Sequence, residues 1–215
     1  MNKRVIDGPE AFADAFGVSR ETLNRLQIYV DLLLHWQKRV NLIGPSTVDQ
    51  VWSRHIADCA QLCDGAYARH KVWLDLGTGA GFPGLVLAIL CRDNPECHVH
   101  LAESISKKTA FLRTVIRELD LSATVHEGRI EKLAAGTLFP TPDAVTARAL
   151  APLAKLLGLA APFIENGAQG IFFKGQDVDD ELTEAAKYWK ITARRERNVV
   201  YPEGCILIIE EASRV

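Results

Sequence analysis

A glycine-rich turn at residues 72–84 is the part of this chain whose residue types and spacing point most directly to chemistry. The segment reads VWLDLGTGAGFPG, so an apolar run leads into Gly77, Gly79 and Gly81. Glycines at alternate positions let the backbone approach a ligand where a Cβ atom would clash. Pro83 suits the start of a helix, and a helix N-terminus presents free N–H groups. We therefore expect a nucleotide-binding turn between a strand and a helix.

The turn alone leaves two classes of cofactor open. Residues 79–84 satisfy G-x-G-x-x-G, which is typical of dinucleotide sites, and Glu103 closes the next expected strand, where it could hold a ribose hydroxyl in either class. Asp75 distinguishes the classes, because a carboxylate here would repel a pyrophosphate but suits a positively charged amino-acid group. We therefore expect S-adenosylmethionine as the cofactor. A nicotinamide or flavin dinucleotide, and a turn without a ligand, are the alternatives.

The elements that must position this turn alternate between strands and helices. Strands are expected at 72–76, 98–103, 123–126, 144–147 and 169–173, and helices at 83–91, 107–119, 130–133, 152–160 and 179–187. Segments 191–200 and 205–210 flank Pro202-Glu203-Gly204, which predicts an antiparallel hairpin. The pattern indicates an α/β, Rossmann-like class I methyltransferase fold, with a seven-stranded, mostly parallel sheet and one antiparallel strand.

Residues 1–70 are expected to form an N-terminal helical extension, packed on a methyltransferase domain at 71–215. Ser19 suits a helix N-cap, an apolar stripe at helical spacing continues to Val40, and Gly44-Pro45 would end that helix. A second helix is expected over 48–64. No linker rich in glycine or serine precedes the turn, and a glycine motif this far into the chain is unusual for a dinucleotide fold.

Composition sets broad limits on the class of protein. The chain has 215 residues, of which 48% are hydrophobic and 24% charged, as is typical of a globular protein. No apolar run approaches the roughly 20 residues of a membrane span, and residues 1–7 lack the apolar core of a signal peptide. We therefore expect a cytoplasmic monomer with no membrane contact. Five cysteines without C-x-x-C spacing and six histidines without ligand spacing argue against a disulfide framework and a metal site.

The charge pattern suggests where a polyanion could bind. The formal net charge is −2, which is unlike an overall basic nucleic-acid binder. Residues 104–117 nevertheless hold four basic and no acidic side chains, and residues 187–197 hold five basic and one acidic, so each cluster is either a solvated face or an RNA contact. His55 could instead be a satisfied histidine between the extension and the core. The residues predicted to bind RNA are Arg54, His55, Lys107, Lys108, Arg194, Arg195 and Arg197.

The residues expected after the fourth strand limit which chemical group of the substrate could be methylated. This segment lacks the Asn/Asp-Pro-Pro-aromatic loop used on exocyclic amines, and no cysteine between Cys97 and Cys205 could serve as the nucleophile needed at a pyrimidine carbon. A ring nitrogen with an in-plane lone pair, such as guanine N7, needs only positioning. We assign no catalytic acid or base, and Arg148 and Lys174, at the ends of expected strands, are positioning candidates.

Several short motifs in a fixed order carry a family resemblance. They are Arg54-His55-Ile-x-Asp58, the segment from Leu74 to Gly84, Glu103-Ser104 with Lys107-Lys108 and Phe111-Leu112, Gly128-Arg129-Ile130-Glu131, Arg148-Ala149 and Phe173-Lys174-Gly175. Together they resemble the bacterial ribosomal RNA small-subunit methyltransferase G family, once called glucose-inhibited division protein B, over about residues 20–211. The resemblance implies methylation of N7 of a specific guanine in small-subunit (16S) ribosomal RNA, either as naked RNA or in an assembled particle.

The same resemblance places individual residues. It puts Gly77 and Phe82 at the amino-acid end of the cofactor, Ile130 and Glu131 beside the adenine, and Arg148 at the boundary with the substrate. The full set of predicted cofactor residues is Asp75, Gly77, Gly79, Gly81, Phe82, Glu103, Ile130, Glu131 and Arg148. Two other functions stay open from the residues alone: a small-molecule or protein methyltransferase on the same fold, and a non-catalytic, cofactor-binding regulatory module.

Overall fold

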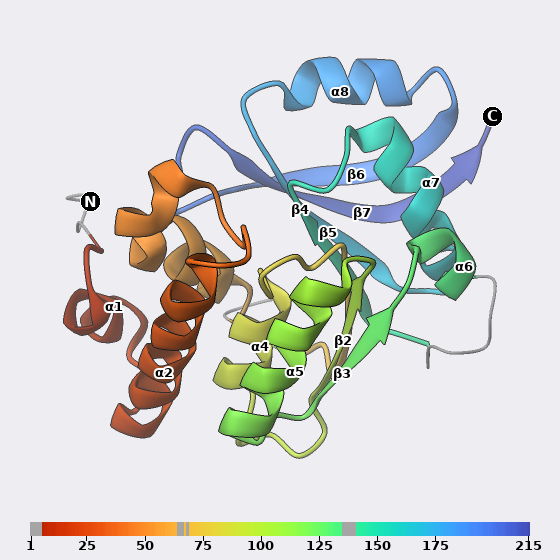
Figure 1. Ribbon diagram of the computed structural model, residues 1–215. Coiled ribbons are helices and arrows are strands. Elements are labelled where there is room, and N and C mark those ends of the chain that lie inside the picture. The colour runs from red at the N-terminus through yellow and green to blue at the C-terminus, as the bar shows by residue number, and fades with distance from the viewer. Residues whose placement is uncertain (1–5, 64–66, 68, 135–140) are drawn as a thin grey trace.

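A twisted sheet with helices on both faces forms the centre of the protein (Figure 1). The computed structural model describes residues 6–63, 67, 69–134 and 141–215. Within them the strands are β1 (Val72–Leu76), β2 (His98–Glu103), β3 (Ala123–Glu127), β4 (Ala144–Arg148), β5 (Gln169–Lys174), β6 (Trp189–Arg197) and β7 (Cys205–Arg214). They form one seven-stranded sheet in the order β3-β2-β1-β4-β5-β7-β6.

The direction of the strands confirms the predicted fold class. Strands β1 to β5 pair in parallel with one another, while β7 lies antiparallel to both β5 and β6. The single reversed strand is therefore β7, and it is inserted between β5 and β6. Its residues Ile206 to Ile209 are buried in succession, which shows that both faces of this strand are covered.

Helices cover the two faces of the sheet as separate layers. They are α1 (Pro9–Phe16), α2 (Arg20–Gln37), α3 (Asp58–Ala60), α4 (Gly84–Leu90), α5 (Ser106–Leu119), α6 (Ile130–Ala134), α7 (Leu153–Ile164) and α8 (Val178–Ala185). Side chains alternate along β1, so Trp73 packs with α2, α4 and α5, and Leu74 packs with α6 and α7. The layers leave the carboxyl ends of the parallel strands at one edge, where ligands bind in open α/β folds.

The first long helix begins where the sequence predicts and ends earlier. Ser19 caps α2, since its Oγ accepts a hydrogen bond from Thr22 N at 3.1 Å. The predicted continuation to Gly44 is wrong, because α2 ends at Gln37. The Gln37 side chain accepts from Leu42 N at 2.8 Å and Ile43 N at 3.0 Å, and so satisfies the backbone of a chain reversal in place of further helix.

The prediction of one regular helix over 48–64 is also wrong. The chain instead forms a 3₁₀ helix (Pro45–Gln50), a π-helical segment (Val51–Ala57), the short α3 and another 3₁₀ turn (Gln61–Cys63), and residue 64 lies outside the described residues. Asp58 and Gln61 bond to Asn198, far away in the sequence. These tertiary contacts override the local helical pattern, and π-helical turns are common at functional sites.

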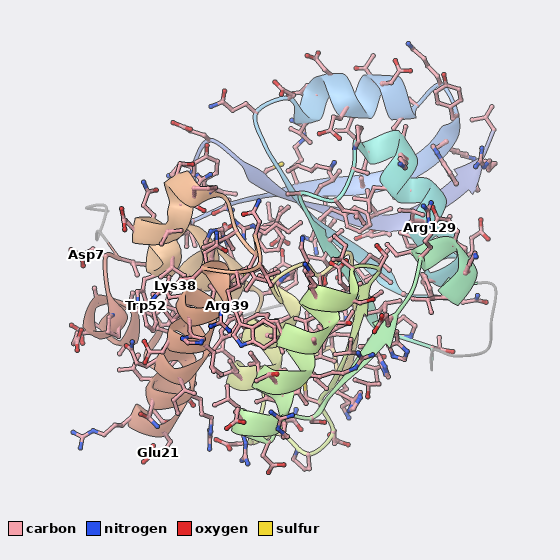
Figure 2. All side chains as sticks on the ribbon, viewed as in Figure 1. Asp7, Glu21, Lys38, Arg39, Trp52 and Arg129 are labelled. Atoms are coloured by element: carbon pink, nitrogen blue, oxygen red, sulfur yellow. The ribbon has the colours of Figure 1, made fainter. Side chains whose placement is uncertain are left out.

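The extension is packed on the sheet layer that carries the glycine turn. Trp52 (Figure 2) is 7% exposed and lies 5.7 Å from Phe12, centroid to centroid, within the same apolar cluster as Trp73. Tyr29 of α2 is fully buried and donates a hydrogen bond to Ala80 O at 2.7 Å, so the extension touches the turn itself. No helix in the described ranges is long and apolar enough to cross a membrane.

Candidate cofactor and substrate site

The three glycines of the turn have different physical roles. Gly77, Gly79 and Gly81 have φ values of +62°, +61° and +100°, which side chains rarely adopt. A Cβ at Gly77 would lie 2.4 Å from Leu150 Cδ1, and one at Gly81 would lie 2.4 Å from Leu85 Cδ1. At Gly79 the nearest atom would be 3.9 Å away. The turn therefore offers open space for a ligand at Gly79, while its other two glycines allow close packing.

Glu103 joins the turn to the end of β2. Its Oε1 accepts hydrogen bonds from Ser104 N at 2.7 Å and Ile105 N at 2.8 Å, and its Oε2 accepts one from Gly79 N at 3.0 Å. A carboxylate offers about four acceptor positions, so one remains on Oε2 beside the open space at Gly79. This arrangement fits the binding of a ribose hydroxyl, the role predicted for Glu103.

Asp75 supports the turn from beneath. Its side chain is 0% exposed, with Oδ2 accepting from Gly84 N at 2.9 Å and Oδ1 accepting from Thr146 Oγ1 at 2.9 Å. Burial raises the pKa of this carboxyl to about 6, although its hydrogen bonds oppose the shift. Asp75 therefore has no exposed oxygen for the predicted direct contact with the cofactor's amino group. Asp75 instead fixes the start of α4 against β1 and β4.

Two further predicted cofactor segments border the turn on opposite sides. Phe82 is 6% exposed and stacks on His55, with ring centroids 4.8 Å apart and planes 22° apart, so it forms an internal wall. Ile130 and Glu131 begin α6, just after Gly128 N donates to Glu103 O at 2.9 Å. Ile130 is buried and Glu131 is exposed, and both follow β3 at the same edge of the sheet as Glu103.

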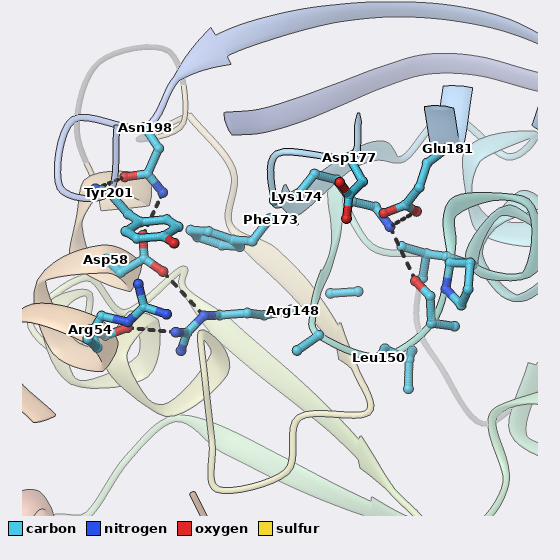
Figure 3. Close-up of a pocket in the computed structure, with 16 residues that line it drawn as sticks. Arg54, Asp58, Arg148, Leu150, Phe173, Lys174, Asp177, Glu181, Asn198 and Tyr201 are labelled. Atoms are coloured by element: carbon cyan, nitrogen blue, oxygen red, sulfur yellow. Dashed lines mark hydrogen bonds and ion pairs between the residues drawn. The ribbon is translucent and has the colours of Figure 1, made fainter. Parts of the chain in front are cut away.

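Arg148, at the end of β4, is held by three groups of the extension, of which Asp58 and Arg54 are drawn in Figure 3. Its Nε lies 3.2 Å from Asp58 Oδ2, its Nη2 donates to Arg54 O at 2.6 Å, and its Nη1 donates to His55 Nδ1 at 3.0 Å. A guanidinium cannot accept a hydrogen bond, so His55 Nδ1 is unprotonated and its Nε2–H donates to Thr47 Oγ1 at 2.9 Å. The network fixes both the orientation of Arg148 and the tautomer of His55.

His55 consequently has the structural role that was the alternative to RNA binding. The ring is 8% exposed and both nitrogens are engaged. Burial, reinforced by the charges of Arg148 and Arg54, lowers its pKa to about 3, so the imidazole is neutral. The predicted contact of His55 with RNA is not available to this buried ring.

A buried polar network that the sequence did not predict connects the extension to the turn between β6 and β7. Asn198 Nδ2 donates to Asp58 Oδ1 at 2.6 Å, and Asn198 Oδ1 accepts from Gln61 Nε2 at 3.1 Å and from Tyr201 N at 2.6 Å. Asp58 is 6% exposed, and burial raises its pKa while Arg148 opposes the shift. The only signal of this network in the sequence was Asp58, which belongs to the same motif as Arg54.

A cavity of about 590 Å³ opens beside Arg148. Its lining comes from the segments after β4 and β5, the π-helical segment, and the β6–β7 turn (Figure 3). Leu150 and Phe173 supply apolar walls. Lys174 Nζ lies 2.6 Å from Glu181 Oε2 and donates to Ala151 O at 3.2 Å, and its side chain is only 6% exposed. Lys174 is therefore a fixed member of the cavity wall and not a mobile surface lysine.

Two lysines of the first basic cluster remain available to an anion, whereas Arg113 pairs with Glu127 and Arg117 with Glu118. Lys107 and Lys108 start α5 directly after the Glu103 segment, and neither forms an ion pair within the described part of the chain. Their charges oppose the dipole of their own helix, which an anionic partner would offset. Arg54, also predicted to bind RNA, lines the cavity with its guanidinium 4.2 Å from the centroid of the Tyr201 ring.

The second basic cluster is divided by the strand that carries it. Arg194 and Arg195 are successive residues of β6 and so point to opposite faces of the sheet. Arg194 pairs with Glu196, and Arg195 forms an ion pair with Asp179. In the described ranges only Arg197 of the three predicted arginines is exposed without an ion pair.

Comparisons with known proteins agree with this arrangement. A family model described as rRNA small subunit methyltransferase G matches residues 22–205. A relative named ribosomal RNA small subunit methyltransferase G in Rhodospirillum rubrum is 50% identical over 96% of this chain and 98% of its own length. A relative of the same name in Paramagnetospirillum magneticum is 48% identical over 96% and 97%, respectively.

Solved structures match at the level of the fold. The cofactor-bound Rv0187 from MTB aligns with a TM-score of 0.59 and 14% identity, covering 96% of this chain and 98% of that one. A putative O-methyltransferase from Klebsiella pneumoniae aligns with a TM-score of 0.56 and 12% identity, over 85% and 90% of the two chains. Both likenesses support a Rossmann-like class I methyltransferase fold.

Proposed function

This chain belongs to the rRNA small subunit methyltransferase G family, and we propose that it uses S-adenosylmethionine to methylate N7 of one guanine in small-subunit (16S) ribosomal RNA. The observation that carries the proposal is the family match, which spans residues 22–205 and is accompanied by relatives of that name at 48–50% identity over nearly the whole chain.

The arrangement of the two halves of the site supports methyl transfer between a cofactor and a base. Leu150 lines the cavity and also lies against Gly77, as the 2.4 Å approach of a Cβ there indicates. The cavity and the glycine turn therefore share a wall. Strands β1 and β4 are neighbours in the sheet, so a base in the cavity would lie beside a ligand on the turn.

The chemistry needs alignment and no catalytic base. Bound S-adenosylmethionine supplies a methyl group on a positively charged sulfur. Guanine N7 has an in-plane lone pair and no proton, so the N–C bond forms as the C–S bond breaks, and no proton has to be removed. The task left to the protein is positioning, which is consistent with the fixed side chains of Arg148 and Lys174 in the cavity wall.

We assign the predicted residues to this function as follows. Gly79 and Glu103 contact the cofactor, Asp75, Gly77 and Gly81 shape the turn, Phe82 forms its inner wall, and Ile130 and Glu131 border the adenine. Arg148 lies between cofactor and base, and Arg54, Lys107, Lys108 and Arg197 meet RNA phosphates. Residues 71–215 form the catalytic domain, with 1–70 packed on it as an extension, and the enzyme acts as a cytoplasmic monomer where ribosomes are made.

Mass mapping of modified nucleotides tests the function in cells. Small-subunit RNA from cells that lack this protein should miss one N7-methylguanosine, and restoring the gene should bring it back. The purified protein should transfer a tritiated methyl group to small subunits. Cofactor binding without methyl transfer would favour a regulatory module. Transfer to metabolites or proteins but not to RNA would favour a small-molecule or protein methyltransferase.

A further inference from the structure

Asp177 brings a carboxylate without a protein partner to the cavity beside Arg148. No ion pair or hydrogen bond of this carboxylate occurs among the described residues, whereas Asp58 and Glu181 are paired with Arg148 and Lys174. Asp177 occupies the N-cap position of α8, where an aspartate usually accepts a backbone hydrogen bond, and its side chain makes none. In Figure 3 it lies on the side of the cavity occupied by Lys174 and Glu181. The carboxylate, which can only accept hydrogen bonds, is therefore available to a ligand with donors.

The balance of charge argues that this ligand group is neutral. The charged residues of the lining are three cations and three carboxylates, namely Arg54, Arg148, Lys174, Asp58, Asp177 and Glu181. A phosphate would be repelled by Asp177, while Lys174, on the same side of the cavity (Figure 3), is already neutralised by its ion pair with Glu181. A nucleobase avoids this repulsion, and Phe173 in the same lining supplies an aromatic side chain on which a base can stack.

The topology places Asp177 at the end of the cavity away from the cofactor turn. It follows β5, which β4 separates from β1 in the sheet, and Leu150 forms the wall next to the turn. A guanine that directs N7 to the turn has its 2-amino group at the opposite end of the base, with N1–H beside it. Both groups are donors, and a carboxylate accepts two such hydrogen bonds in parallel.

We infer that Asp177 determines specificity in the proposed reaction by accepting hydrogen bonds from N1–H and the 2-amino group of the target guanine. This inference rests on the proposed function and adds to it the residue that recognises the base. Adenine presents an acceptor at N1 and lacks the 2-amino group, so its N1 lone pair would face the carboxylate of Asp177 and both hydrogen bonds would be lost. A site built to bond a donor rejects analogues that lack it.

The test compares guanosine with inosine, which lacks only the 2-amino group, at the mapped target nucleotide of reconstituted small subunits. Wild-type kcat/KM should fall about 10- to 100-fold on inosine, the range expected for the loss of one hydrogen bond to a charged group. Asp177→Asn should lower kcat/KM on guanosine by a similar factor and reduce the guanosine-to-inosine ratio to below about threefold. Asp180→Asn, an exposed neighbour on α8 outside the cavity lining, is the matched control and should behave as wild type.

Two results would overturn the inference, and they can be told apart. An Asp177→Asn protein that transfers methyl groups with the wild-type rate and the wild-type guanosine-to-inosine ratio would refute the role of Asp177 alone. A wild-type protein that methylates neither particle, while binding S-adenosylmethionine in calorimetry, would refute the proposed function and the inference with it. Equal cofactor affinity of both variants and wild type shows that the fold is intact.

Discussion

The ion pair between Arg148 and Asp58 permits a prediction of both stability and activity. Asp58→Asn keeps the shape of the side chain and the oxygen that accepts from Asn198, but it places an amide nitrogen opposite Arg148 Nε. Two donors then face each other where the wild-type atoms lie 3.2 Å apart. The side chains are 18% and 9% exposed, so water replaces little of the lost interaction.

The magnitude follows from this burial. Removing one partner of a buried ion pair costs about 3–5 kcal/mol in general. Arg148 keeps its bonds to Arg54 O and His55 Nδ1, so we expect a loss at or just below the lower limit of this range, about 2–3 kcal/mol in the free energy of unfolding. For a chain of this length that corresponds to a fall in Tm of roughly 5–10 °C. Because Arg148 lines the cavity, kcat/KM for methyl transfer should also fall about tenfold.

Urea unfolding and a methyl-transfer assay would measure the two effects. The matched control is Glu184→Gln, which breaks the exposed pair with Lys187, whose side chains are 53% and 60% exposed. This control should change the free energy of unfolding by no more than about 0.5 kcal/mol. The reasoning fails if Asp58→Asn and Glu184→Gln have the same urea midpoint.

Three further predictions address the turn and the RNA surface. Gly79→Val should abolish cofactor binding in calorimetry, because the φ of +61° at this position excludes a β-branched residue and the valine side chain would fill the open space. The control Gly44→Ala should bind the cofactor normally. Retained affinity in Gly79→Val would contradict the site. The raised pKa of Asp75, about 6, gives a stability contribution that is present below the unfolded value of 3.8 and lost as pH rises through 6. Asp75 should therefore add up to about 3 kcal/mol to the free energy of unfolding of the wild type as pH falls from 7 to 4, and Asp75→Asn should lack this gain. Equal pH profiles of the two proteins in urea unfolding would refute this assignment. Lys107→Ala/Lys108→Ala should weaken RNA binding and reduce the slope of log K against log[salt] by about 1–2, with cofactor affinity unchanged, and an unaltered slope would rule out phosphate contacts there.

The order and type of the main strands and helices follow from local features of the sequence. Alternating glycines permit positive φ, and apolar runs separated by amphipathic segments favour a sheet between helices. The Pro202–Gly204 turn forces the last two strands to be antiparallel. Each requirement acts over a few residues, so the α/β fold and its glycine turn could be predicted.

The failure of the helix predicted over 48–64 has a cause far along the chain. Residues 48–64 have an apolar pattern suited to a helix, but the side chains of Asp58 and Gln61 bond to Asn198, which lies 140 and 137 residues further along the chain. Helix propensity is a weak preference that such contacts override. The same contacts bring His55 against Arg148 and bury it, which no spacing within the motif could indicate.

The sequence by itself determined that the chain carries a strand–glycine turn–helix unit, a distal acidic residue and an ordered set of family motifs, since these depend on backbone conformation and near neighbours. Only the tertiary structure decided what each residue does in the site. It showed that Gly79 faces open space while Gly77 lies under Leu150, that Asp75 supports the turn from beneath, and that Asp177 has no side-chain partner in the part of the chain that the structure describes. The physical reason is that the strand order joins the ends of β1, β4 and β5 at one edge, and burial and pairing across that edge depend on residues far apart in the sequence.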